Sequence, residues 1–133
     1  IIPAVNYAQV APEHRHAVAD AIERVMNSAF REAPTSVVDH CRAALTVLLS
    51  RWLVQTNRED EGALALDLGP LAKRMEAHEM SCVANAAQVV ARLHARGKPN
   101  EQQARGLRPP ESGDDEFALE AVGLAIRDLG WSI

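Results

Sequence analysis

The feature that most constrains the fold is a stripe of apolar residues that recurs every three or four positions between residues 38 and 53. Its members are Val38, Cys41, Ala44, Leu45, Leu48, Leu49, Trp52 and Leu53. This spacing is typical of an amphipathic α-helix with one buried face. Because it is the widest such stripe in the chain, we expect a central helix here, against which the other elements pack.

The same periodicity predicts a helix before the central one. It should begin at Pro12, a favourable residue for a first helical turn, and end before Pro34. The residues expected on its buried face are Val18, Ala21, Ile22, Val25, Met26, Ala29 and Phe30. Ser36, followed three residues later by Asp39, resembles a capping box and predicts the start of the central helix.

Three more helices are expected after the central one. A short helix is predicted to start at Pro70, and a long one to run from about Ser81 to Arg96, where Gly97 suits a left-handed C-cap. The last should be capped by Ser112 or Asp114. Its first turn carries Asp114, Asp115 and Glu116, and negative charge favours a helix N-terminus.

Together these segments predict an all-α fold, an antiparallel four- to five-helix bundle. The chain has 133 residues, the size of one domain, so residues 1–133 are expected to form a single helical domain with an extended lead-in over residues 1–11. Twenty-three alanines favour helices that approach closely. The first residue is Ile rather than Met, which suggests a fragment of a longer chain.

The sequence favours a cytoplasmic protein without a membrane contact. No apolar run reaches the roughly 18 residues of a membrane span, and no signal-peptide pattern opens the chain. Cys41 and Cys82 lie within helical patterns without CxxC spacing, so buried thiols are expected.

Charge is distributed unevenly. Residues 92–110, here called the basic segment, hold five cations and one carboxylate, a net charge of +4 in a chain of net charge -4. The remainder of the chain therefore carries about -8. A basic patch on an acidic protein indicates an anionic ligand or partner.

The basic segment is predicted to be a loop that contacts RNA or a nucleotide, because arginine guanidinium groups match phosphate oxygens. The residues expected to bind the ligand are Arg92, Arg96, Lys98, Asn100, Gln102, Arg105 and Arg108. Two alternatives remain: a solvated connection, or a loop whose arginines pair with Asp114, Asp115 and Glu116 just beyond it.

Metal ligands and cofactor motifs are weakly represented. His78 and Cys82 are four residues apart and are expected on one helix face, a spacing that can chelate a transition metal. His14 and His16 are expected to be exposed and to face different directions. The sequence has no GxGxxG, P-loop, GxSxG or HExxH motif. We therefore expect neither a metal site nor a cofactor.

The last third of the chain resembles HEPN-type domains, and among them the abortive-infection C-terminal domains. The resemblance rests on the run from Val89 to His94, the Arg-Gly-Lys-Pro-Asn turn that follows, and the run from Asp114 to Ala125. Residues 33–44 are similar to the start of the family's central helix.

This resemblance implies a helical bundle that is commonly a homodimer. In active members it implies a metal-independent ribonuclease whose motif is an Arg, four to six residues, then a His. Arg96 matches the motif arginine, but positions 101–103 hold Glu-Gln-Gln where the His belongs. Histidine suits proton transfer because its pKa is near 6.5, whereas glutamine cannot transfer protons.

The leading reading is therefore a non-catalytic HEPN-like accessory or binding domain in a defence or toxin-related system. The first alternative is a metal-independent endoribonuclease that uses Arg96 for phosphate charge and His94 or Glu101 for proton transfer. The second alternative is a structural dimerisation or protein-interaction module whose basic segment packs on acidic residues of a protein partner.

Overall fold

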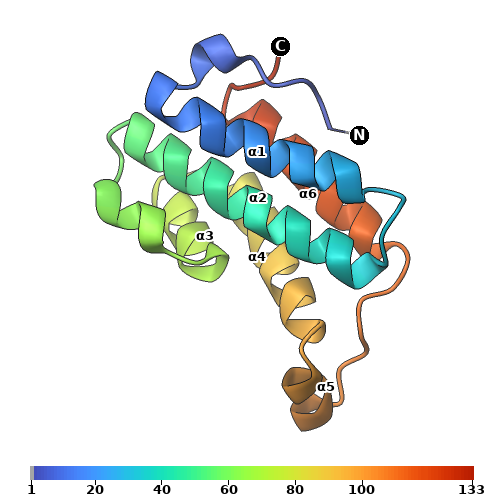
Figure 1. The fold of residues 1–133 in the computed structure, drawn as a ribbon. Coiled ribbons are helices and arrows are strands. Elements are labelled where there is room, and N and C mark those ends of the chain that lie inside the picture. The colour runs from blue at the N-terminus through green and yellow to red at the C-terminus, as the bar shows by residue number, and fades with distance from the viewer. Residues whose placement is uncertain (1) are drawn as a thin grey trace.

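The computed structural model describes residues 2–133, apart from the side chains of Glu101 and Ala104. The predicted all-α fold is confirmed (Figure 1). In chain order the elements are the 3-10 helix η1 (Tyr7–Gln9), α1 (Pro12–Ser28), α2 (Pro34–Gln55), the 3-10 helix η2 (Glu61–Ala65), α3 (Leu68–Ala77), α4 (Ser81–Arg96), α5 (Pro99–Arg105) and α6 (Asp114–Asp128). Within residues 2–133, none of these helices is both long and apolar enough to span a bilayer.

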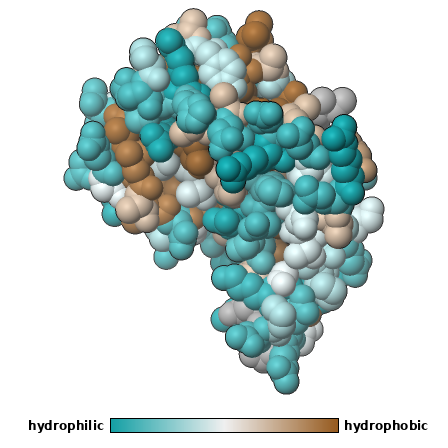
Figure 2. Space-filling model, viewed as in Figure 1, coloured by the Kyte–Doolittle hydropathy of each residue, from teal (hydrophilic) through white to brown (hydrophobic). Residues whose placement is uncertain are grey.

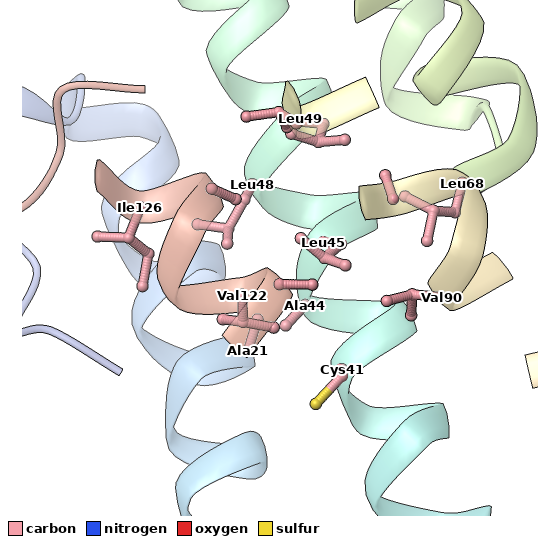
Figure 3. Close-up of a cluster of buried hydrophobic side chains, with 14 of the residues drawn as sticks. Ala21, Cys41, Ala44, Leu45, Leu48, Leu49, Leu68, Val90, Val122 and Ile126 are labelled. Atoms are coloured by element: carbon pink, nitrogen blue, oxygen red, sulfur yellow. The ribbon is translucent and has the colours of Figure 1, made fainter. Parts of the chain in front are cut away.

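Helix α2 is the centre of the bundle, as its apolar stripe predicts. It packs against α1, α3, α4, α6 and η2. Figure 3 shows Val122 and Ile126 of α6 on one side of α2 and Val90 of α4 on the other. Leu48 is completely buried in this core, and burial of one such side chain contributes about 1.5–3 kcal/mol. The pattern of contacts explains why no other stripe in the sequence is as wide.

The predicted end of the first helix is wrong. Helix α1 ends at Ser28, and Phe30 has a left-handed backbone with φ of 63°. The amides of Arg31 and Glu32 donate to the Ser28 carbonyl, so the chain turns back at this point. Consequently Phe30 is 88% exposed and Met26 53% exposed, although both were predicted to be buried.

The predicted helix caps are also wrong. Helix α2 begins at Pro34, before Ser36, and its first turn has no side-chain cap hydrogen bond. Proline has no N–H for a cap to satisfy, so a helix that begins at Pro34 loses little free energy without a cap. Helix α3 begins at Leu68 rather than Pro70, and the residue that precedes α6 is Gly113.

The lead-in is not extended throughout. It contains η1, and it pairs with the C-terminus through a bridge between Val5 and Ser132. The Asn6 amide donates to the Trp131 carbonyl at 2.7 Å, and Trp131 is itself buried. The described part of the lead-in thus belongs to the packed structure, whereas Ile1 lies outside the described residues.

The basic segment was predicted to be a loop, but it contains helix α5. Pro99 occupies the start of this helix, and Gly106, with φ of 63°, ends it. Gly97 is right-handed, with φ of -74°, and so is not the predicted left-handed cap. In Figure 1, α5 projects away from the bundle at the end of α4, and Figure 2 shows this projection covered mainly by hydrophilic and near-neutral residues.

Candidate functional site

The cations of the basic segment lie on the end of α4, on α5 and on the loop that returns to α6. Arg92, Lys98 and Arg105 are exposed, and Arg96 is partly buried. Arg92 and Arg96 are four residues apart on α4, so they share one helix face about 6 Å apart along the axis. Arg92 and Lys98 therefore present positive charge to solvent at the end of α4, from which α5 projects (Figure 1).

Arg108 is in an ion pair with Asp114. Its Nη2 donates to Asp114 Oδ1 at 3.0 Å and its Nη1 donates to the other carboxylate oxygen. The Arg108 guanidinium lowers the pKa of Asp114 to about 2, with a further contribution from the Glu111 amide. For Arg108, therefore, the alternative that the arginines of the segment pair with the acidic residues beyond it applies. This ion pair holds the return loop to the start of α6.

The polar side chains of the segment differ in what they contact. Gln102 donates its side-chain amide to the Arg96 carbonyl, a bond that ties α5 to the end of α4. Asn100 is exposed in the first turn of α5. The Glu101 side chain, one of the proposed proton-transfer groups, lies outside the described part of the chain. Of the two amides predicted to contact a ligand, Asn100 is exposed and Gln102 is partly buried.

His94 faces α2 rather than the projecting segment. Its Nδ1 lies 3.3 Å from Asp39 Oδ1, which also accepts a hydrogen bond of 3.3 Å from Arg42 Nη2. A hollow of about 220 Å³ opens beside His94 and is lined by Thr35, Ser36, Asp39, His94, Gly97 and Lys98. A second hollow, of about 140 Å³, adjoins it and is lined by Arg42, Asp67, Leu68, Gly69, Ala91, His94 and Lys98. We call these two hollows the His94 cleft.

The pKa of the His94 imidazole is lowered from its ordinary value, which favours the neutral form. Burial lowers its pKa most, and the positive charges of Arg42 and Lys98 lower it further, against the opposite effects of Asp39 and Asp67. The Asp39 carboxylate near Nδ1 favours the tautomer that carries the proton on this nitrogen and leaves Nε2 with a lone pair. The cleft thus contains an imidazole of lowered pKa, two cations and two carboxylates.

The sequence alone did not identify Asp39, Arg42 or Asp67 as site residues. Asp39 and Arg42 are three residues apart on α2, a spacing that usually indicates only a surface ion pair. Here Arg42 Nε is buried and has no hydrogen-bond partner among the described residues. The packing of α4 on α2 brings Asp39 and Arg42 to His94, and Asp67 joins them from the residue that precedes α3.

His16 is exposed on α1 as predicted, whereas His78 and His14 are not placed as predicted. His78 ends α3 and its Nε2 lies 2.8 Å from Glu59, while Cys82 is exposed in the first turn of α4, so the two do not share a helix. His14 was predicted to be exposed but is buried, and Arg51 Nη1 lies 3.1 Å from its Nδ1. The spacing of His78 and Cys82 in the sequence therefore does not place them on one helix face.

Comparison of the chain with protein-family models, curated proteins and solved structures finds no match. The resemblance to HEPN-type domains therefore stays a prediction from the sequence.

Proposed function

We propose that this chain is a non-catalytic, HEPN-like binding domain that contacts RNA or a nucleotide through the basic segment. The observation that carries the proposal is the position of Arg92, Arg96, Lys98 and Arg105 on or beside the projecting end of α4 and α5. From the resemblance we also propose that the domain works as a homodimer in a defence or toxin-related system.

Electrostatics favours a ligand at this segment over one elsewhere on the surface. The chain outside the basic segment carries a net charge of about -8, which repels phosphates. Arg92 and Arg96 stand one helical turn apart, so a single flexible strand reaches both. Phosphate contacts of this kind supply affinity without base specificity.

Binding is tested by fluorescence anisotropy with a labelled single-stranded RNA at low salt in EDTA. We expect saturable binding that Arg92→Ala combined with Arg96→Ala weakens at least ten-fold. Arg127→Ala is the matched control, because it removes an exposed arginine from the last turn of α6. Equal affinity of the double variant and the control would refute this function.

The second candidate function is a metal-independent endoribonuclease, and the Asp39–His94 contact favours it. A carboxylate beside an imidazole whose pKa is lowered is an arrangement that suits a general base. His94 Nε2 would take the proton of a ribose 2′-hydroxyl, and that oxygen would form a bond to phosphorus. The bond to the 5′-oxygen then breaks, and this oxygen takes a proton from water, which leaves a 2′,3′-cyclic phosphate and a 5′-hydroxyl.

In this reaction the cations that line the cleft would stabilise the negative charge of the phosphorane. Lys98 and Arg42 line it together with His94, whereas Arg96 lines neither hollow. We therefore assign phosphate stabilisation in the nuclease reading to Lys98 and Arg42, rather than to Arg96 as the sequence suggested.

A denaturing gel of the RNA samples distinguishes the two functions. Cleavage in EDTA that is lost in His94→Gln but kept in His16→Gln would make the protein a nuclease. His16 is a matched control, because it is an exposed histidine in the first turns of α1. Intact RNA in every sample, with binding retained, supports the non-catalytic function.

A further inference from the structure

A hollow between α1 and α2 is larger than either part of the His94 cleft. The two helices pack side by side (Figure 1), and the hollow lies along their contact with a volume of about 390 Å³. Small-molecule sites in proteins have volumes of roughly 300–1,000 Å³, so this hollow is large enough for a nucleoside. Its lining combines small apolar side chains with two arginine–aspartate pairs.

The apolar part of the lining consists of short side chains. They are Ala17 and Ala21 of α1 and Ala43, Ala44 and Val47 of α2. Ala21 and Ala44 are buried, and the other three are partly buried. Alanine has no side-chain atom beyond Cβ, which explains why the two helices pack closely and still leave a hollow. An apolar surface of this kind favours contact with the face of an aromatic ring.

The charged part of the lining is balanced. Two ion pairs border the hollow, each with one nitrogen–oxygen contact of 3.3 Å: Asp20 with Arg24 on α1, and Asp39 with Arg42 on α2. His40 also lines the hollow, and its Nε2 lies 3.5 Å from a carboxylate oxygen of Glu32. Because the two pairs have no net charge, the hollow does not favour a phosphate, and it suits a neutral ligand with both donors and acceptors.

The pair on α1 has hydrogen-bonding capacity left for such a ligand. A carboxylate accepts at two oxygens, and a guanidinium donates from five N–H groups. The one contact between Asp20 and Arg24 joins Oδ2 to Nη2, and both side chains are at least half exposed. Asp20 Oδ1 and the remaining N–H groups of Arg24 therefore stay accessible, side by side, at the edge of the hollow.

The hollow adjoins the His94 cleft. Asp39 lines the hollow and one part of the cleft, and Arg42 lines the hollow and the other part. Lys98 of the basic segment lines both parts of the cleft. A single strand held at Lys98 can therefore follow the cleft and place an unstacked base in the hollow, as proteins that recognise single-stranded RNA do.

We propose that the hollow binds one unstacked base of the RNA and prefers guanine. The inference rests on the proposed function, because the basic segment holds the strand to which this base belongs. Guanine presents two neighbouring donors, N1–H and N2–H, to the carboxylate of Asp20, and its O6 and N7 accept from Arg24, one turn along α1. Adenine, cytosine and uracil have no two neighbouring ring-edge donors, so they pair less completely with a carboxylate and a guanidinium.

The first test measures the affinity of labelled oligouridine and of the same strand with one central guanosine, inosine or adenosine. We expect the guanosine strand to bind about five-fold or more tightly than the uridine and adenosine strands, with inosine between them because it lacks the N2 amino group. Asp20→Asn and Arg24→Ala should each remove this preference. Glu23→Gln and Arg31→Ala are matched controls, because both residues are exposed and neither lines the hollow.

The preference is separable from binding itself. Arg92→Ala combined with Arg96→Ala should weaken all strands and leave the ratio between guanosine and uridine strands unchanged. RNA that does not bind at all refutes the proposed function, whereas RNA that binds without a preference for guanosine overturns the present inference alone. A preference that persists in Asp20→Asn and Arg24→Ala would also overturn it.

The second test does not depend on RNA binding. In an NMR titration with guanosine 5′-monophosphate, we expect the largest shifts at the backbone amides of Ala17, Ala21 and Ala43, and we expect Asp20→Asn to reduce them. Uridine 5′-monophosphate is the control and should shift these amides less. Shifts that are absent from these positions, or equal for the two nucleotides, would overturn the assignment of a guanine site to the hollow.

Discussion

Phe30→Gly should stabilise the protein, although its sequence pattern places Phe30 on a buried helix face. The left-handed conformation, with φ of 63°, costs a residue that has a Cβ atom about 1–2 kcal/mol, and glycine avoids this cost. Glycine also raises the entropy of the unfolded chain, which offsets about 0.5–1 kcal/mol. The ring is 88% exposed, so its removal gives up little buried area.

The expected net effect is an increase of about 0.5–1 kcal/mol in the free energy of unfolding, equivalent to about 2–5 °C in Tm. Urea denaturation followed by circular dichroism measures it, and the m-value should stay constant. Leu48→Ala is the reference, since Leu48 is fully buried in the core and should lose about 2–5 kcal/mol. A loss of more than about 2 kcal/mol in Phe30→Gly would mean that Phe30 is packed as the sequence pattern suggests.

Three further predictions concern titrating groups. Burial lowers the pKa of His14 below its ordinary 6.5, so the unfolded chain binds a proton at a higher pH than the folded chain does. The free energy of unfolding should therefore fall as pH drops below about 6.5 and be independent of His14 above about pH 7. Urea midpoints at pH 7.5 and 5.5 measure this fall, and His14→Asn should reduce it. Asp39→Asn should lower the pKa of His94 further, because the Asp39 carboxylate favours the protonated imidazole. Proton NMR of the His94 ring measures this pKa, and an unchanged value would show that the contact is absent. Arg108→Ala should raise the pKa of Asp114 from about 2 towards its ordinary 3.8, as followed by carbon NMR of the carboxyl group, whereas a pKa that stays near 2 would show that Arg108 is not the main cause.

The bundle was predictable because helix periodicity and burial agree along most of the chain. The stripe on α2 and the start of α4 at Ser81 are read directly from the spacing of apolar residues. The same reasoning failed at Met26 and Phe30, which continue the periodic pattern after packing has ended. Periodicity indicates which residues share a helix face. It does not indicate where along the helix another element stops packing against that face.

The basic segment was found from charge, but its structure and partners were not. Alternation of proline, amides and glycine suggested a loop, whereas Pro99 starts a short helix and Gly106 ends it. The contact between His94 and Asp39 joins residues 55 positions apart, and nothing local in either segment indicates it. Sites that depend on the packing of two helices are beyond the reach of a single sequence.

The salt dependence of RNA binding tests the central claim most directly. Single-stranded nucleic acid gives a slope of log K against log salt of about -0.7 per phosphate contact, so contacts by Arg92, Arg96, Lys98 and Arg105 predict about -3. Replacement of Arg92 and Arg96 by alanine should bring the slope to about -1.4, whereas Arg127→Ala should leave it near -3. A slope near zero, or the same slope in all three proteins, would contradict the assignment of RNA binding to the basic segment.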